Sequence, residues 1–248
     1  MTHAIILGCR VDAVDTAQAV DRIRELLRVG SPSLVVTLGT EMIVRAQHDE
    51  RFRAIVNASA LSLCDTVGVM FAARVRRARI RERVAGVDLV DPLCRALARD
   101  GTPVYLLGSK GDTAERAAGV LRARHPGLIV AGFHDGYFAP SDDAAVAAAV
   151  ARSGARVLLA GLGSPRQELW LAEHLKETDC AVGIGIGGSL DVLAGNVRRA
   201  PVLWQRAHVE WLYRLVREPR RWRRQLALPR FVWLVLRDQA LLALPRRS

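Results

Sequence analysis

Apolar residues along this chain gather in short runs that alternate with stretches of helical periodicity. Six runs rich in Val, Ile and Leu occur at residues 33–37, 61–65, 103–107, 128–131, 156–160 and 180–184. A helical pattern follows each of them, which is typical of parallel strands joined by crossover helices. We therefore expect an α/β fold: a Rossmann-like, mostly parallel sheet with helices on both faces, plus a helical C-terminal appendage.

Two helix starts carry clear signals. The segments Asp112-Thr113-Ala114-Glu115 and Ser164-Pro165-Arg166-Gln167 both fit a capping box, the second with proline at the first helical position. Each follows a strand that ends in glycine, at Gly108 and at Gly161-Leu162-Gly163. A strand, a glycine turn and a capped helix predict an anion site at the carboxyl edge of the sheet.

The last fifth of the chain has a different composition. Four of the five tryptophans lie beyond residue 203, and residues 206–248 hold eleven arginines against three acidic residues, which accounts for +8 of the net charge of +11. We therefore expect two parts: an α/β catalytic domain over residues 1–203 and a basic, Trp-rich helical appendage over residues 204–248.

The appendage is predicted to bind an anionic partner. Arg214, Arg217, Arg221 and Arg224 recur at spacings of three and four, which would align them on one helical face if Pro219 only kinks the helix. Trp and Leu residues lie between them. This composition favours a helix lying on an anionic membrane. A nucleic-acid-binding α/β protein is the alternative, because arginines neutralise phosphates and tryptophan stacks on bases.

The composition also excludes several classes of protein. The N-terminus does not fit a signal peptide, and no apolar stretch reaches the length of a membrane span. Cys9, Cys64, Cys94 and Cys180 are scattered, as expected for reduced, buried cysteines of a cytoplasmic protein. No D-x-D, H-E-x-x-H or P-loop motif is present, so we expect no metal and no cofactor. With a sugar nucleotide as substrate, arginines would replace the metal.

Two polar residues end neighbouring apolar runs. Asp65 closes the second run and Thr37 the first. Since ligands of open parallel sheets bind outside the carboxyl ends of the strands, Asp65 is a candidate general base, with Thr37 beside it. The alternative is that Asp65 merely caps the next helix.

A later glycine segment permits two interpretations. Residues 183–188 fit G-x-G-x-x-G, as in an NAD-linked oxidoreductase. The helix that follows has room only from about Ser189 to Leu193, which favours a tight turn presenting Asp191 to a ribose or base. Gln167 is ambiguous too, because glutamine three residues after a cap satisfies the capping box itself. Six arginines within residues 74–83 fit a solvated face, a lipid head group or a diphosphate.

Taken together, these segments resemble the WecG/TagA/CpsF glycosyltransferases over nearly the whole chain. The matching blocks are Val35-Val36-Thr37, Cys64-Asp65-Thr66-Val67-Gly68, Glu82-Arg83-Val84-Ala85-Gly86-Val87-Asp88-Leu89, Leu106-Leu107-Gly108-Ser109, Gly136-Tyr137-Phe138, Gly161-Leu162-Gly163-Ser164-Pro165-Arg166-Gln167-Glu168, Gly185-Ile186-Gly187-Gly188-Ser189-Leu190-Asp191, Arg199-Ala200-Pro201, Glu210-Trp211-Leu212-Tyr213-Arg214 and Glu218-Pro219-Arg220-Arg221. One departure is Thr37-Leu38-Gly39, where many relatives have Thr-Pro-Asn.

The resemblance implies a metal-independent, inverting transfer of an N-acetylmannosamine-type or related sugar. The donor is a UDP-sugar, and the acceptor is an undecaprenyl-diphosphate-linked sugar at the inner face of the cytoplasmic membrane. The implied roles are catalytic for Asp65 and Thr37, donor-binding for Gly108, Tyr137, Gln167 and Asp191, and diphosphate-stabilising for Arg83, Arg214, Arg221 and Arg224. The resemblance also implies that nucleic acid is not a partner of this protein. Self-association through an exposed apolar tail stays open.

Overall fold

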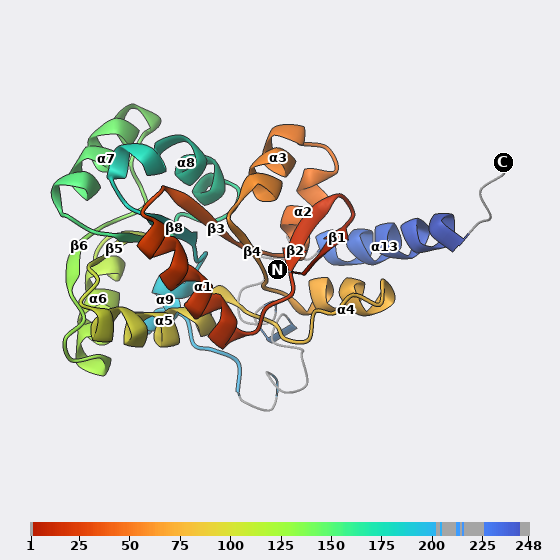
Figure 1. Cartoon of the computed structure of the whole chain (residues 1–248), viewed down its shortest axis with the longest axis horizontal. Helices are drawn as coiled ribbons and strands as arrows, with labels where there is room; N and C mark the ends of the chain where they lie inside the picture. Colours follow the sequence, from red (N-terminus) through yellow and green to blue (C-terminus); the bar gives the residue numbers. More distant parts are fainter. Residues whose placement is uncertain (1, 202–203, 205–211, 214, 216–225, 244–248) are drawn as a thin grey trace.

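Six parallel strands form the central sheet of the computed structural model, in the order β4-β3-β8-β7-β5-β6 (Figure 1). The strands are β3 (Ser33–Leu38), β4 (Leu61–Cys64), β5 (Val104–Gly108), β6 (Val130–His134), β7 (Val157–Gly161) and β8 (Val182–Gly185). The structure describes residues 2–201, 204, 212, 213, 215 and 226–243. All six predicted strands are present, and the α/β prediction is confirmed.

Helices cover both faces of this sheet because its strands are apolar on both sides. One face carries α1 (Thr16–Val29), α5 (Gly86–Asp100), α6 (Thr113–Arg124) and α9 (Ser189–Leu193), and the other carries α2 (Thr40–Ala46), α3 (Glu50–Ala58), α7 (Asp143–Arg152) and α8 (Arg166–His174). Two short 3-10 turns accompany these helices: η1 (Pro140–Asp142) precedes α7, and η2 (Leu175–Thr178) follows α8. Neighbouring strand residues alternate between the two cores, as Val35 and Val36 do.

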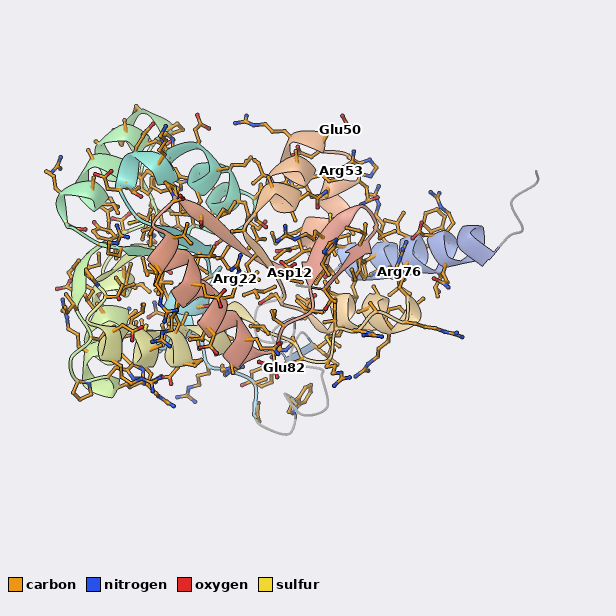
Figure 2. All side chains as sticks on the ribbon, in the orientation of Figure 1. Asp12, Arg22, Glu50, Arg53, Arg76 and Glu82 are labelled. Carbon is orange, nitrogen blue, oxygen red and sulfur yellow. The ribbon has the colours of Figure 1, made fainter. Side chains whose placement is uncertain are left out.

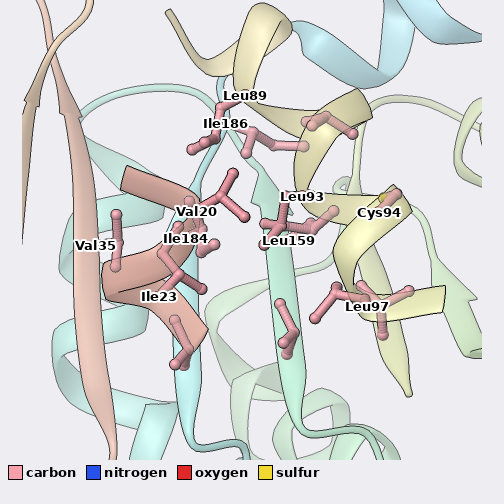
Figure 3. Packing of buried hydrophobic residues seen from close by; sticks show 14 of the residues in the cluster. Val20, Ile23, Val35, Leu89, Leu93, Cys94, Leu97, Leu159, Ile184 and Ile186 are labelled. Carbon is pink, nitrogen blue, oxygen red and sulfur yellow. The ribbon is translucent and has the colours of Figure 1, made fainter. Parts of the chain in front are cut away.

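The core beneath α1 and α5 consists of buried apolar side chains. Figure 3 shows Ile23 of α1, Leu93 of α5 and Ile184 of β8, which belong to one cluster of buried apolar side chains. All three side chains are fully buried. Burial of each contributes about 1.5–3 kcal/mol to folding relative to an exposed side chain, so this interface fixes the helices on the sheet.

An N-terminal hairpin, which the sequence pattern did not predict, packs beside β4. Strands β1 (His3–Ile6) and β2 (Cys9–Asp12) are antiparallel, and Leu7 and Gly8 between them both have positive φ, as a two-residue hairpin turn requires. Asp12, labelled in Figure 2, accepts hydrogen bonds from the Ser62 amide at 2.7 Å and from Arg10 at 2.8 Å. This buried carboxylate ties the hairpin to the sheet.

The C-terminal helix α13 (Ala227–Ala243) packs against α2 and α4 (Val67–Val75), as Figure 1 shows. Its Phe231 and Val235 are buried in the core that these helices share. Arg76, at the end of α4, forms an ion pair with Asp238 of α13. Part of the apolar tail sequence therefore packs on the α/β unit, and the predicted boundary near residue 203 stays a prediction.

Both capping-box predictions were wrong: α6 begins where expected, and α8 begins one residue later than expected. Asp112 precedes α6 with ψ of 3° rather than the extended backbone of a capping residue, and its carboxylate pairs with Arg116 at 3.1 Å. Helix α8 begins at Arg166, so Pro165 precedes the first helical position. The Gln167 side chain turns away to a neighbouring loop.

The glycines at the sheet edge allow strands and loops to approach closely. Gly108 has φ of 144°, and a Cβ there would lie 2.5 Å from the carbonyl of Gly161. Gly136 is pressed against Gly108 in the same way, where a Cβ would lie 3.0 Å from the Gly108 Cα. Only glycine fits these contacts without displacing backbone.

We expect Gly108→Ala to lower the free energy of unfolding by at least about 1–3 kcal/mol, the usual range for a strained backbone alone, with the clash in addition. Gly111→Ala is the matched control: φ is 60°, but a Cβ there meets nothing within 4 Å. It should lose only about 1–2 kcal/mol. Denaturant titration measures both variants, and equal losses would show that the close approach to Gly161 is not a constraint.

Candidate functional site

The described part of the predicted site lies along one edge of the sheet, at the carboxyl ends of the parallel strands. These ends are Leu38, Cys64, Gly108, His134, Gly161 and Gly185. Thr37, Asp65, Gly108, Tyr137, Gln167 and Asp191 all lie at these ends or in the loops and first helical turns that follow them. Arg214, Arg221 and Arg224 fall outside the described residues.

Asp65 follows β4 directly and is half-buried. Its amide donates to the Leu38 carbonyl at 3.1 Å, and its Oδ1 accepts from the Gly86 amide at 2.8 Å. The helix after it is capped by Thr66, whose hydroxyl accepts from the Val69 amide. The alternative that Asp65 caps this helix is therefore wrong, and Gly86 holds the carboxylate at the sheet edge.

Thr37 lies on β3, the strand beside β4, as predicted. Its hydroxyl is buried and donates to the Gly185 carbonyl at 2.8 Å, on the β8 side of β3. Thr37 therefore links the half of the edge that carries Asp65 to the half that carries the glycine loops.

Cys64, next to Asp65, is buried, as are the other three cysteines. Burial and, to a smaller extent, the Asp65 carboxylate raise the pKa of its thiol to about 12, although Arg83 lowers it. The thiol is therefore protonated at neutral pH, which removes it as a nucleophile.

Arg83 lies in the segment that crosses above the ends of β4 and β8. The amide of the next residue, Val84, donates to the Cys64 carbonyl at 2.8 Å, and Arg83 itself pairs with Asp88 at 3.1 Å. Arg199 pairs with the other oxygen of Asp88 at 2.7 Å. One carboxylate thus holds two guanidinium groups: Arg83, near Cys64 at the end of β4, and Arg199, from the segment before the appendage.

The loops after β5 and β8 meet through a side-chain contact that the sequence analysis missed. Ser109 donates from its hydroxyl to Asp191 at 2.9 Å, and its amide donates to the Gly161 carbonyl at 3.2 Å. Asn196 also contacts Asp191, at 3.4 Å. Asp191 is thus fixed at the sheet edge at the start of α9, whose length matches the prediction.

Gly183 and Gly185, within residues 183–188, lie where side chains of other elements approach β8 closely. A Cβ on Gly183 would lie 2.8 Å from Leu171 and Leu175, and one on Gly185 would lie 2.6 Å from the Gln167 amide. Close helix–strand packing therefore explains this glycine pattern on β8.

Gln167 and Glu168 form a buried polar pair at the start of α8. The Gln167 Nε2 donates to Glu168 Oε1 at 2.6 Å, and its Oε1 accepts from the Gly187 amide at 3.0 Å. Burial raises the pKa of Glu168, and nearby Glu41 raises it further, against hydrogen bonds from Gln167 and Ser164 that lower it. Sequence reasoning missed this pair because Gln-Glu in a first helical turn looks like a cap.

Tyr137 is the exposed member of the predicted set, with 75% of its surface accessible. It follows β6, and its amide donates to Asp135 at 2.7 Å in a tight turn. Gly136 beside it donates to the Ser109 carbonyl at 2.7 Å, so the loop of Tyr137 lies against Ser109, which itself contacts Asp191. Within the part of the chain that the structure describes, no group of three His, Cys, Asp or Glu side chains could hold a metal ion.

We expect Glu168→Gln to stabilise the protein at neutral pH. A carboxyl group whose pKa is raised in the folded state contributes stability fully below its unfolded pKa and loses it as pH rises through the folded pKa. An amide of the same shape has no such loss, so the advantage of Glu168→Gln should grow between about pH 4 and pH 8.

Thermal unfolding across this pH range measures the effect. Glu173→Gln is the control, because Glu173 lies on the same helix with its side chain 60% exposed. A Glu168→Gln variant less stable than the parent at pH 8 would contradict a buried, proton-binding Glu168.

The chain also matches a family model, described as the glycosyl transferase WecG/TagA/CpsF family, over residues 4–243. The match extends from the first strand of the hairpin to the end of α13. It therefore includes every predicted site residue at the sheet edge. The chain belongs to the WecG/TagA/CpsF family of glycosyl transferases.

Proposed function

We propose that this glycosyltransferase moves a sugar of the N-acetylmannosamine type, or a related one, from UDP to an undecaprenyl-diphosphate-linked sugar. The product would enter a cell-surface polysaccharide or a teichoic acid linkage unit. The observation that supports this most is that the candidate base and the candidate donor-binding residues occupy different parts of the same sheet edge. The Asp65 carboxylate is anchored at the β4 end, and the loops with Tyr137, Gln167 and Asp191 lie at the other strand ends.

The proposed reaction is a single displacement. Asp65 takes the proton from an acceptor hydroxyl while that oxygen forms a bond to the anomeric carbon, and the bond from that carbon to the UDP oxygen breaks. Attack from the face opposite the leaving group inverts the configuration. The hydrogen bond from the Gly86 amide holds this carboxylate at the sheet edge, where the acceptor hydroxyl is proposed to bind.

Negative charge grows on UDP as it leaves, and we propose that arginines stabilise it in place of a metal. Arg83 is held beside the end of β4 by Asp88. Guanidinium groups match the diphosphate because they donate two parallel hydrogen bonds to its oxygens. Arg214, Arg221 and Arg224 are proposed to complete this set.

The acceptor is a lipid, and α13 supports a site at the inner face of the cytoplasmic membrane. One face of α13 packs on the protein through Phe231 and Val235, while Trp233 and Leu236 are 56% and 51% exposed. Arg237 stacks on the Trp233 ring at 4.8 Å. Exposed Trp and Leu beside arginine are the features of a helix at an anionic interface. Among the helices described, none is long and apolar enough to cross a membrane.

Replacing Asp65 by Asn should lower kcat by about 10²–10⁴-fold and leave UDP affinity unchanged, because the amide cannot accept the proton but keeps the shape of the site. Release of UDP in single-turnover and steady-state assays measures kcat. Asp112→Asn is the control, since that carboxylate is exposed just before α6 and pairs with Arg116, four residues on. Turnover of Asp65→Asn within a few fold of the parent would remove Asp65 from the role of base.

The double variant Trp233→Ser/Leu236→Ser should bind anionic liposomes about 10–100-fold more weakly than the parent. Full burial of each side chain contributes about 1.5–3 kcal/mol, and only the exposed half of each is left to leave water. The control is Val29→Ser/Ile129→Ser, which removes two exposed apolar side chains from other parts of the surface. Liposome flotation measures binding. Equal binding of both double variants would exclude α13 as the membrane contact.

A further inference from the structure

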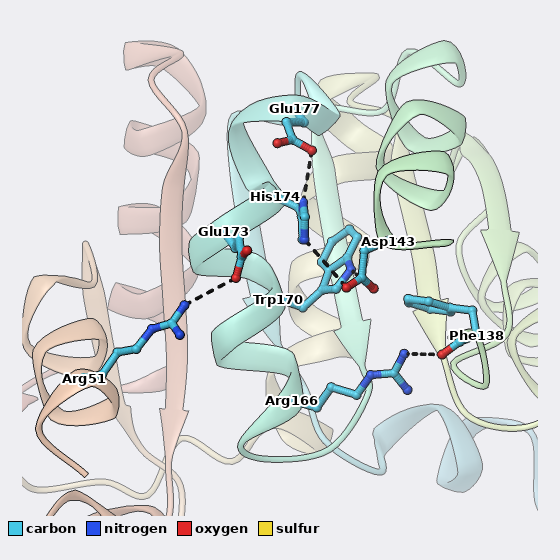
Figure 4. A network of polar contacts seen from close by, with 8 residues as sticks. All are labelled: Arg51, Phe138, Asp143, Arg166, Trp170, Glu173, His174 and Glu177. Atoms are coloured by element: carbon cyan, nitrogen blue, oxygen red, sulfur yellow. Dashed lines mark hydrogen bonds and ion pairs between the residues drawn. The ribbon is translucent and has the colours of Figure 1, made fainter. Parts of the chain in front are cut away.

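Arg166, the first residue of α8, reaches across to the loop that carries Tyr137. Its Nη1 donates to the Gly136 carbonyl at 2.6 Å, and its Nη2 donates to the Phe138 carbonyl at 2.9 Å. Figure 4 shows this side chain extended from α8 toward Phe138. The guanidinium therefore holds the residues immediately before and after Tyr137.

The same guanidinium lies over the Phe138 ring, 4.4 Å from its centroid. Phe138 in turn meets the Trp170 ring edge-on at 6.4 Å, and the Trp170 indole donates to Asp143 at 3.0 Å. Trp170 is buried and Phe138 half-buried, so one side of the loop is packed against α7 and α8.

Tyr137 stands apart from these contacts. It is 75% exposed between two residues whose carbonyls are both held, and its own amide is held by Asp135. An exposed aromatic ring on a loop fixed at three backbone positions loses little conformational entropy when a flat ligand stacks on it.

We propose that Arg166 is a positioning residue for the donor site: it clamps the loop so that the Tyr137 ring forms a preset stacking surface for the nucleobase of the donor. This proposal rests on the proposed function, which supplies the nucleotide. A planar guanidinium suits the task because its fixed fork donates to two carbonyls at once, which a lysine ammonium on a flexible stem does less well.

The experiment measures UDP affinity by calorimetry in the full-length protein and in Arg166→Met, Tyr137→Ala and the double variant. Arg166→Met should weaken UDP binding about tenfold, since two hydrogen bonds to a charged group are lost. In the Tyr137→Ala background the same substitution should change UDP affinity less than about twofold, because the stacking ring is already absent. In turnover assays the KM for the donor should rise, with kcat at saturating donor unchanged.

Two further variants serve as controls. Arg51→Met removes another arginine that pairs with α8, through Glu173 at 3.4 Å, but one that contacts no residue of the Tyr137 loop (Figure 4). It should leave UDP affinity unchanged. Arg166→Lys keeps the positive charge and gives an intermediate loss, which provides the measurement if Arg166→Met does not fold.

Amide hydrogen exchange without nucleotide reports on the clamp independently. Residues 136–139 should exchange faster in Arg166→Met than in the parent or in Arg51→Met. Unchanged exchange, or an equal loss of UDP affinity with and without Tyr137, would overturn the positioning role. If the parent protein does not bind UDP but the loop exchanges faster in Arg166→Met, the clamp stands while the nucleotide and the proposed function fall.

Discussion

Close contact between glycine backbones at the carboxyl edge of the sheet is the constraint on which the site depends. A Cβ on Gly108 would strike the carbonyl of Gly161, and one on Gly161 would lie 2.9 Å from the Gly187 carbonyl. These contacts bring the loops after β5, β7 and β8 together, and Gly136 adds the loop after β6. Asp191, Gln167 and Tyr137 then project from loops that are already packed against one another.

Buried polar groups join this glycine edge to the strands that carry Asp65. Thr37 connects β3 to the end of β8, and Gln167 connects the start of α8 to Gly187. A buried carboxyl group, Glu168, accepts the remaining Gln167 contact and fixes the orientation of its amide. Since an unsatisfied buried polar group would destabilise the fold, these hydrogen bonds constrain the site as strongly as they constrain stability.

The sheet could be predicted from the sequence because its strands are short apolar runs, most of them buried on both faces, and the carboxyl ends of such strands meet at one edge. This rule for parallel strands placed Thr37, Asp65 and Asp191 correctly at that edge. The helix caps could not be predicted, because the sequence Ser-Pro-Arg-Gln is compatible either with a capping box or with a tertiary contact of the glutamine. In this protein the Gln167 side chain accepts a hydrogen bond from the Gly187 amide. The roles of Ser109 and Arg166 depend on partners 82 and 28–30 residues away along the chain, which no local pattern encodes.

The most direct test of the account is turnover of UDP-sugars on a short-chain lipid-diphosphate-linked acceptor, with EDTA present throughout and with or without anionic liposomes. The account predicts release of UDP together with a glycosylated lipid of inverted anomeric configuration, at a rate that rises when liposomes are added. A folded protein that binds no UDP, or one whose turnover ceases with EDTA and returns only with a divalent metal, would contradict it.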